Sequence, residues 1–174
     1  MINNIKQKSL WQIDKIRKGR LPIYQYFYRK AQSPPRKFSC LRLIYKVMLK
    51  ITCFAYHVEL SAETSIGAGL YIGHPYGITI NPATVIGRNC NIHKGVTLGQ
   101  ENRGSRKGTP VIGDCVWIGI NSTIVGNITI GDDVLIAPNT YVNCDIPSHS
   151  IVFGNPCIVK HRDNATEGYI NNKV

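Results

Sequence analysis

The chain has 174 residues, with 21 Lys and Arg against 10 Asp and Glu and a formal net charge of +11 at pH 7. This length suits one domain with a substantial core plus an appendage. No nucleic-acid-binding motif accompanies the positive charge, so we expect no nucleic acid among the partners.

The first 57 residues are predicted to form a basic helical segment. Residues 1–50 hold thirteen Lys and Arg but a single acid, Asp14, whereas the rest of the chain is nearly neutral. The pattern is helical up to a break at Pro34 and Pro35, and helical spacing of apolar residues resumes after it. One interpretation is a cap on the adjoining fold, with solvated Lys and Arg outside. The other, compatible with it, is a peripheral contact with an anionic membrane.

From residue 58 onwards, an aliphatic residue recurs at every sixth position. A small or β-branched residue often lies two positions before it. A period of six fits neither a helix nor a simple strand, and it is typical of stacked triangular coils. We therefore predict an all-β left-handed parallel β-helix of hexapeptide repeats over residues 58–156. The aliphatic positions are Leu60, Ile66, Ile72, Ile80, Ile86, Ile92, Leu98, Ile112, Ile118, Ile124, Ile130, Ile136 and Val142.

The repeat is interrupted twice. Ile72 and Ile80 are eight positions apart, so two extra residues lie in the sequence YIGHPYG. Leu98 and Ile112 are fourteen apart, which predicts a projecting loop over residues 100–109. A tail over residues 157–174 follows the repeats.

Two histidines are candidates for chemistry. His74 lies at the first interruption, where a corner of the prism opens, and a histidine there can accept a proton from a hydroxyl during acyl transfer. A histidine that only caps a turn is the alternative. His93 is expected on the adjacent coil, either lining the same cleft or as a surface residue. We expect His57, His149 and His161 to be structural or solvated.

No window of apolar residues reaches transmembrane length and no secretory leader is evident, which favours a cytoplasmic protein. The six cysteines are dispersed and include no C-x-x-C pair. This pattern favours free thiols in a reducing compartment and no metal site.

Residues 56–162 resemble a known family. The stretches HVELSAETSIGAGLYIGHPYGITI and PVIGDCVWIGINSTIVGNITIGDDVLIAPN, together with the closing GNP, resemble the serine acetyltransferases. They also resemble the short capsule and exopolysaccharide O-acetyltransferases, including the colanic-acid type. The resemblance implies an acetyl-CoA-dependent O-acetyltransferase that forms a homotrimer, with its cleft between neighbouring β-helices.

The resemblance also implies residue roles. His74 matches the catalytic base, and Glu59 falls where the family places the carboxylate that orients it. Three small residues match positions where the pantetheine arm of the cofactor runs close to backbone: Gly99, Gly119 and Ala137. Lys160 and Arg162 would meet the phosphates of the cofactor, or they are solvated charges of the tail.

Three departures decide the predicted acceptor. The serine acetyltransferases carry Asp where this chain has Gly73, and His where it has Thr109. Their large N-terminal helical domain is also missing. Because acidic partners for an ammonium group are lost, we predict a sugar or glycan acceptor, which could be lipid-linked. Alternatives are a serine acetyltransferase or a non-catalytic scaffold; a metal-dependent carbonic anhydrase would need a third converging histidine.

Overall fold

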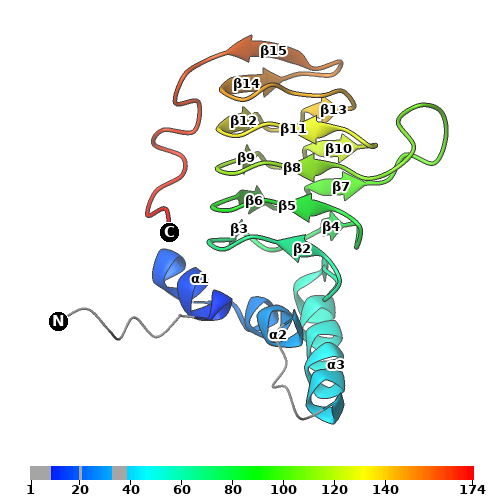
Figure 1. The fold of residues 1–174 in the computed structure, drawn as a ribbon, viewed down its shortest axis with the longest axis vertical. Coiled ribbons are helices and arrows are strands. Elements are labelled where there is room, and N and C mark those ends of the chain that lie inside the picture. Colours follow the sequence, from blue (N-terminus) through cyan, green and yellow to red (C-terminus); the bar gives the residue numbers. More distant parts are fainter. Residues whose placement is uncertain (1–8, 20, 33–38) are drawn as a thin grey trace.

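The computed structural model describes residues 9–19, 21–32 and 39–174. Three helices lie beneath the first coil of the solenoid (Figure 1): α1 (Leu10–Lys18), α2 (Ile23–Gln32) and α3 (Ser39–Tyr56). The predicted break at Pro34 and Pro35 falls outside the described residues. No helix within the described ranges combines the length and the apolar character needed to cross a bilayer.

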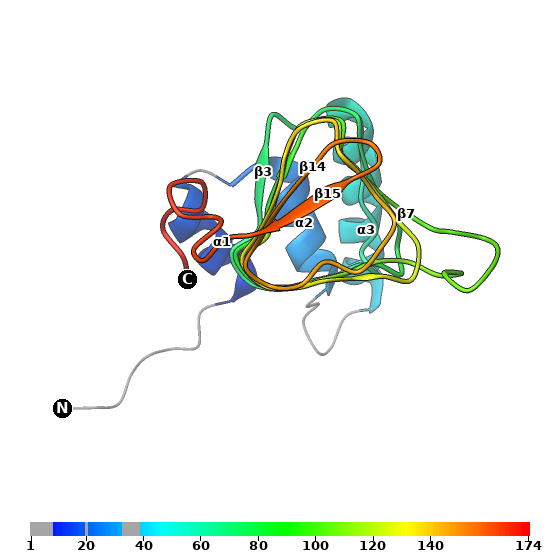
Figure 2. The ribbon, with the colours of Figure 1, turned by 90° about the horizontal axis from the view of Figure 1, so that it is seen from above.

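The strands build a left-handed parallel β-helix of about five turns, which confirms the predicted fold. Figure 2 looks down its axis and shows the triangular cross-section. Sheet A contains β1 (Val58–Glu59), β4 (Ile78–Ile80), β7 (Thr97–Gly99), β10 (Thr123–Val125) and β13 (Tyr141–Val142). Sheet B contains β2 (Ser65–Ile66), β5 (Val85–Ile86), β8 (Val111–Ile112) and β11 (Thr129–Ile130). Sheet C contains β3 (Tyr71–Gly73), β6 (Asn91–His93), β9 (Trp117–Ile118), β12 (Val134–Ile136), β14 (Ser150–Phe153) and β15 (Ile158–His161).

The six-residue repeat accounts for the core. Every aliphatic residue of the repeat is buried, and the most exposed of them, Leu60, retains 8% of its surface. Equivalent residues of successive coils pair in register, as Ile86 does with Ile112 in sheet B. Because each coil is too thin to bury its own apolar face, this stacking supplies the hydrophobic core.

A third interruption of the repeat was not predicted. After Val142 the next buried aliphatic residue is Ile146, which bridges to Ile130 on the coil below. The regular pattern then returns, because Val152 pairs with Ile136. The last complete coil is therefore shortened at this corner, and a search for strict six-residue spacing ends one strand too early.

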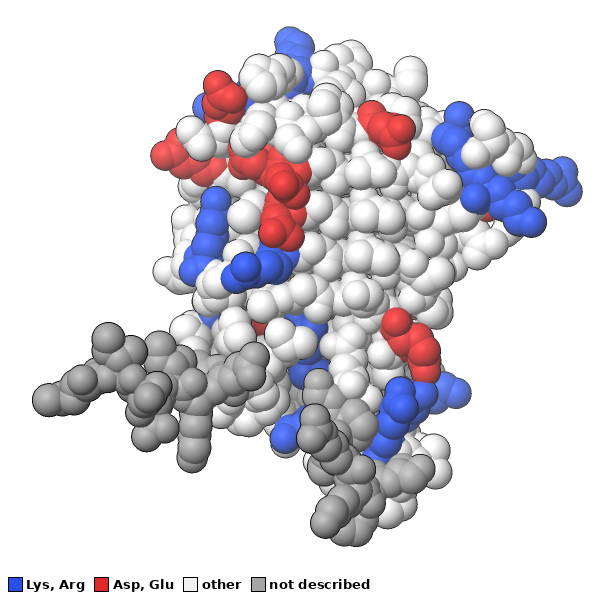
Figure 3. Space-filling view, in the orientation of Figure 1, with Lys and Arg blue, Asp and Glu red and all other residues white. Residues whose placement is uncertain are grey.

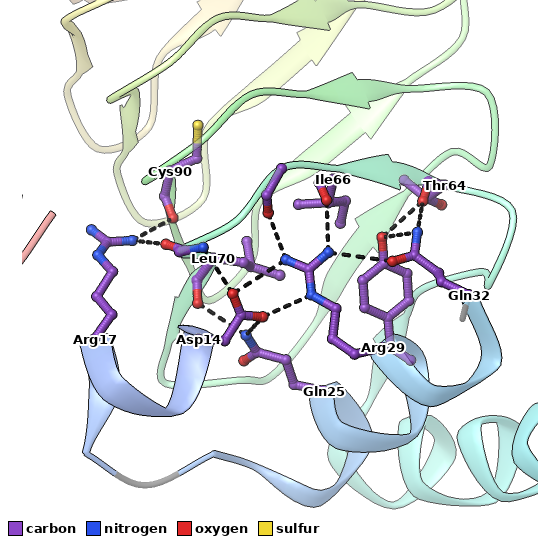
Figure 4. Close-up of polar contacts among 12 residues, drawn as sticks. Asp14, Arg17, Gln25, Arg29, Gln32, Thr64, Ile66, Leu70 and Cys90 are labelled. Carbon is purple, nitrogen blue, oxygen red and sulfur yellow. Dashed lines mark hydrogen bonds and ion pairs between the residues drawn. The ribbon is translucent and has the colours of Figure 1, made fainter. Parts of the chain in front are cut away.

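Two charged side chains close the lower end of the prism (Figure 4). Arg29 on α2 donates to the carbonyl oxygens of Ile66 and Gly67, both at 2.6 Å, and pairs with Asp14 on α1 at 2.7 Å. The side chains of Arg29 and Asp14 are both fully buried. The helices thus satisfy backbone carbonyls that the first coil leaves without a strand partner.

Arg17 on α1 extends this network. Its guanidinium donates to the carbonyl oxygen of Gly69 and to Oδ1 of Asn91, the latter at 2.6 Å. Gln25 bridges Asp14 and the carbonyl oxygen of Leu70, at 3.0 and 2.9 Å. The expectation that the basic residues of this segment all lie outside in solvent is wrong for Arg17 and Arg29, because the carbonyls of the first coil need donors.

The upper end is closed differently. Strand β15 runs antiparallel to β14, and all four of its residues are exposed. The chain then descends along the prism and ends near α1 (Figure 1). The backbone N–H of Val174 donates to Oδ1 of Asn89 at 2.9 Å, and Thr166 donates through its N–H and hydroxyl to Asp133. The C-terminal tail is therefore fastened along most of its length.

Candidate active site

His74 occupies the corner where the chain passes from sheet C to sheet A. Strand β3 ends at Gly73, and residues 74–77 form the turn that leads into β4. His74 is exposed and has φ 53°. Ten residues other than glycine adopt this left-handed conformation in the described part of the chain, so φ alone does not distinguish His74. Its exposed position in this turn is compatible with the predicted role as a base, which stays a prediction.

Several predicted site residues form one column above this corner. Gly73 pairs with His93 on the next coil. Ile92 pairs with Ile118, so the residues that follow them, His93 and Gly119, are in register on neighbouring coils. The same extension leads from Gly119 to Ala137, because the N–H of Gly119 donates to the carbonyl oxygen of Ile136 at 2.8 Å. We call Gly73, His93, Gly119 and Ala137 the corner column.

His93 fills the space beside Gly73. A Cβ atom added to Gly73 would lie 2.6 Å from Nδ1 of His93. The imidazole packs against the Trp117 ring, with 4.8 Å between ring centroids, and lies 6.3 Å from the Tyr71 ring. Burial, and then the nearby His74, lower the pKa of His93, which favours its neutral form. Its Nε2 is buried, and none of the described residues forms a hydrogen bond with it.

The upper part of the column is nearly bare backbone. A Cβ atom on Gly119 would lie 2.6 Å from the backbone nitrogen of Pro138, so packing between coils alone requires glycine there. One coil above Ala137, the register reaches Phe153. The ammonium group of Lys160 lies 5.8 Å from the centroid of the Phe153 ring. A single predicted cation therefore stands at the top of the column.

Glu59 lies in sheet A on the coil below the His74 turn. It ends β1 and pairs with Thr79, two residues past the turn that His74 begins. Its side chain is exposed and helps to line a cleft of about 470 Å³ between α3 and the first coil, which also includes Lys46 and Lys50. Within the described residues, no hydrogen bond joins Glu59 to His74, so its orienting role stays a prediction.

Other predicted residues lie at different corners. Gly99 ends β7 where sheet A gives way to sheet B, and the projecting loop leaves from this corner (Figure 2). The Thr109 hydroxyl closes the loop by donating to the carbonyl oxygen of Ala83 at 3.1 Å. Lys and Arg gather on the loop (Figure 3). Arg162 lies at the far edge of sheet C, where its N–H donates to the carbonyl oxygen of His149 at 2.8 Å. Within one chain, Thr109 and His74 therefore lie at different corners of the prism.

Sequence reasoning missed the aromatic residues around His93. Tyr71 and Trp117 were not singled out, and Tyr169 of the tail packs edge-on against Trp117 with 5.0 Å between ring centroids. Tyr71 and Trp117 occupy equivalent positions in sheet C on the coils directly below and above the coil of His93, which is a signal that the repeat could have supplied. Among the described residues, no group of three or more His, Cys, Asp and Glu is placed to hold a metal ion.

Known proteins share this architecture. The family of bacterial transferase hexapeptides (six repeats) matches residues 109–144. Serine acetyltransferase of Staphylococcus xylosus is 36% identical over 133 residues, which cover 76% of this chain and 60% of that protein. Serine acetyltransferase of Helicobacter pylori is 34% identical, covering 64% of this chain and 66% of that protein. The chain thus spans less than two thirds of these relatives.

A solved structure agrees with these relatives. Soybean serine acetyltransferase complexed with serine has a TM-score of 0.68 and 28% identity, covering 79% of this chain and 56% of that chain.

These relatives correct the predicted acceptor. The sugar or glycan acceptor, and the particular likeness to capsule and exopolysaccharide enzymes, are wrong, because relatives and structural neighbours are named serine acetyltransferases. The missing acid at Gly73 was the main argument for a sugar. The structure offers another reason for glycine at position 73, because the ring of His93 already occupies the space that a side chain there would need.

The sequence repeat, the triangular solenoid and the named relatives all indicate the same kind of protein. The chain is similar to the hexapeptide-repeat acyltransferases, whose family model matches residues 109–144.

Proposed function

We propose that this protein is an acetyl-CoA-dependent serine O-acetyltransferase. The observation that carries the proposal is the position of His74, exposed in the turn between β3 and β4 at the foot of the corner column. The names of the relatives, and the serine held by the soybean structure, support serine as the acceptor. A general base at this corner can act on a hydroxyl that attacks the thioester of acetyl-CoA. The corner is lined largely by backbone, which leaves room for the long, thin pantetheine arm that carries the thioester.

In this reaction His74 takes the proton of the serine hydroxyl as its oxygen attacks the thioester carbonyl carbon. A carbon–oxygen bond forms and the carbon–sulfur bond breaks. The proton held by His74 then passes to the departing thiolate, so free coenzyme A and the serine ester are released. Glu59 acts by accepting the other ring N–H of His74 and fixing its orientation.

The corner column supplies the path for the pantetheine arm. From His74 to Phe153 the column rises through four coil steps of about 4.8 Å each. Gly119 has no side chain and Ala137 has only a methyl group, so an arm can lie close to the backbone along this part of the column. At the top, the proposal assigns a cofactor phosphate to the ammonium group of Lys160, which lies 5.8 Å from the centroid of the Phe153 ring. Arg162 joins it only if its long side chain reaches across the sheet.

We further propose that the site is completed between copies in a homotrimer. Thr109 and the basic loop leave from the corner after β7, so a loop can cover His74 only from a neighbouring chain. Helix α3 supports self-association, because it exposes a row of large apolar side chains. These are Leu43, Ile44, Val47, Ile51 and Phe54. Contact of the basic N-terminal helices with anionic lipid remains a prediction.

The proposal is tested by following thiol release from acetyl-CoA. We expect release that depends on L-serine and is absent with L-alanine, which lacks the hydroxyl. His74→Ala should lower kcat by at least about 100-fold, whereas Glu59→Gln should lower kcat less and leave KM for acetyl-CoA unchanged. A trimeric, folded wild-type protein without serine-dependent release would contradict the proposal.

A further inference from the structure

Two cysteines lie side by side at the upper end of the solenoid. The Sγ atoms of Cys144 and Cys157 are 3.8 Å apart. Cys144 lies in the turn after β13, and Cys157 lies in the turn between β14 and β15. A disulfide needs a sulfur–sulfur distance of about 2 Å, so the two sulfurs must approach by about 2 Å. Because both residues lie in turns, side-chain rotation can supply much of this movement.

The remaining cysteines differ from this pair. Cys53 and Cys90 are buried, and burial raises the pKa of their thiols, to about 11 for Cys53 and about 12 for Cys90. Cys40 is exposed but belongs to α3 at the other end of the molecule, and Cys115 is half-buried in the turn between β8 and β9. Cys144 is exposed, whereas Cys157 is half-buried and packs against the core. The pair therefore combines an accessible thiol with a shielded one.

The location gives such a bond a structural consequence. The lower end of the solenoid is held by the buried side chains of Arg17 and Arg29, whereas the upper end is closed by β15 alone, with all its residues exposed. A backbone hydrogen bond links β13 to the turn after β14, because the N–H of Tyr141 donates to the carbonyl oxygen of Gly154 at 3.2 Å. In a solenoid, terminal coils open first because each has a neighbour on one side only. A covalent link here would hold the last coil closed.

We propose that Cys144 and Cys157 form a reversible disulfide clasp that fastens the β14–β15 hairpin to the last coil under peroxide oxidation. The Cys144 thiolate attacks one oxygen of hydrogen peroxide, which breaks the oxygen–oxygen bond, forms a sulfenic acid and releases hydroxide. The Cys157 thiolate then attacks that sulfur and expels a second hydroxide. The two thiol protons convert both hydroxides to water, so one peroxide is reduced and two thiols are oxidised.

The test uses the full chain, treated with one equivalent of hydrogen peroxide, alkylated and mapped without reduction. We expect one linked peptide pair containing Cys144 and Cys157, the loss of two hydrogen atoms per chain and reversal by dithiothreitol. The unfolding midpoint should rise by roughly 5 °C or more on oxidation. Cys144→Ser and Cys157→Ser should abolish the link and the shift, whereas the matched control Cys40→Ser should keep both.

Three results would overturn the clasp. The first is Cys144 oxidised to a sulfinic acid while Cys157 is recovered as an alkylated thiol. The second is a link between two chains in place of the link within one. The third is an internal link that leaves the unfolding midpoint unchanged, because the bond would then fasten nothing.

Discussion

Replacing Arg29 by Met should strongly destabilise the fold. The substitution keeps an apolar stem of similar length but removes the donors to Ile66 and Gly67 and the ion pair with Asp14. Asp14 still accepts hydrogen bonds from the N–H of Gly69, at 2.8 Å, and from the side-chain amide of Gln25. Its buried charge, however, loses the guanidinium that lies 2.7 Å away in wild type. Breaking a buried pair in this way costs about 3–5 kcal/mol, a large share of the stability of a typical domain.

Urea unfolding followed by circular dichroism measures this loss. The matched control is Lys46→Met, which removes a partly exposed pair with Glu63 and should cost less than about 1 kcal/mol. The double variant Asp14→Asn/Arg29→Met should be more stable than the sum of the two single changes predicts, because no lone charge remains. If Arg29→Met costs as little as Lys46→Met, the capping role assigned to the buried network is refuted.

Four further predictions concern the site and the surface. Gly119→Ala should destabilise the chain by about 1–3 kcal/mol, measured by urea unfolding, because the added Cβ meets the backbone of the next coil. Nuclear magnetic resonance titration should place the pKa of His93 below the ordinary value of about 6.5. A lowered pKa means that the unfolded chain binds more protons than the folded chain near this pH. The unfolding midpoint of wild type should therefore fall relative to that of His93→Gln as pH falls through about 6.5, and parallel curves of midpoint against pH would contradict this. Gly73→Asp should lower kcat/KM for serine in the wild-type background, because the new side chain meets the ring of His93. In a His93→Ala background, which makes room for the carboxylate, the same change should raise kcat/KM for serine about tenfold. If the basic helices bind lipid, Lys50→Glu should reduce flotation with vesicles containing phosphatidylglycerol at low salt, and equal flotation would exclude that contact.

The repeat determined how much of the fold was predictable. A side chain at every sixth position must face the core, so Ile86 and Ile118 could be assigned to it from spacing alone. The shortened corner between Val142 and Ile146 escaped notice because a deletion leaves no inserted residues to recognise. The burial of Arg17 and Arg29 also escaped, because charge composition does not reveal which cations meet backbone carbonyls.

The candidate site was predictable in part for the same reason. Interruption of the repeat drew attention to His74 as a candidate base, since an inserted pair of residues must open a corner. The meaning of Gly73 could not be read from its neighbours in sequence, because the side chain that fills its space belongs to His93, twenty residues later. The lone acid Asp14 in a basic segment was a usable signal for a buried ion pair. The separation of Thr109 from His74 followed only from the positions of the corners.

The most direct test of the proposed reaction is the identity of its product. Acetyl-CoA labelled with carbon-13 at the carbonyl carbon is incubated with L-serine and wild-type protein, and nuclear magnetic resonance locates the label. The reaction proposed at His74 predicts the label in an ester on the serine side-chain oxygen, formed by wild type and not by a folded His74→Asn variant. Label that stays on coenzyme A with wild type, or an ester formed equally by the variant, would contradict it.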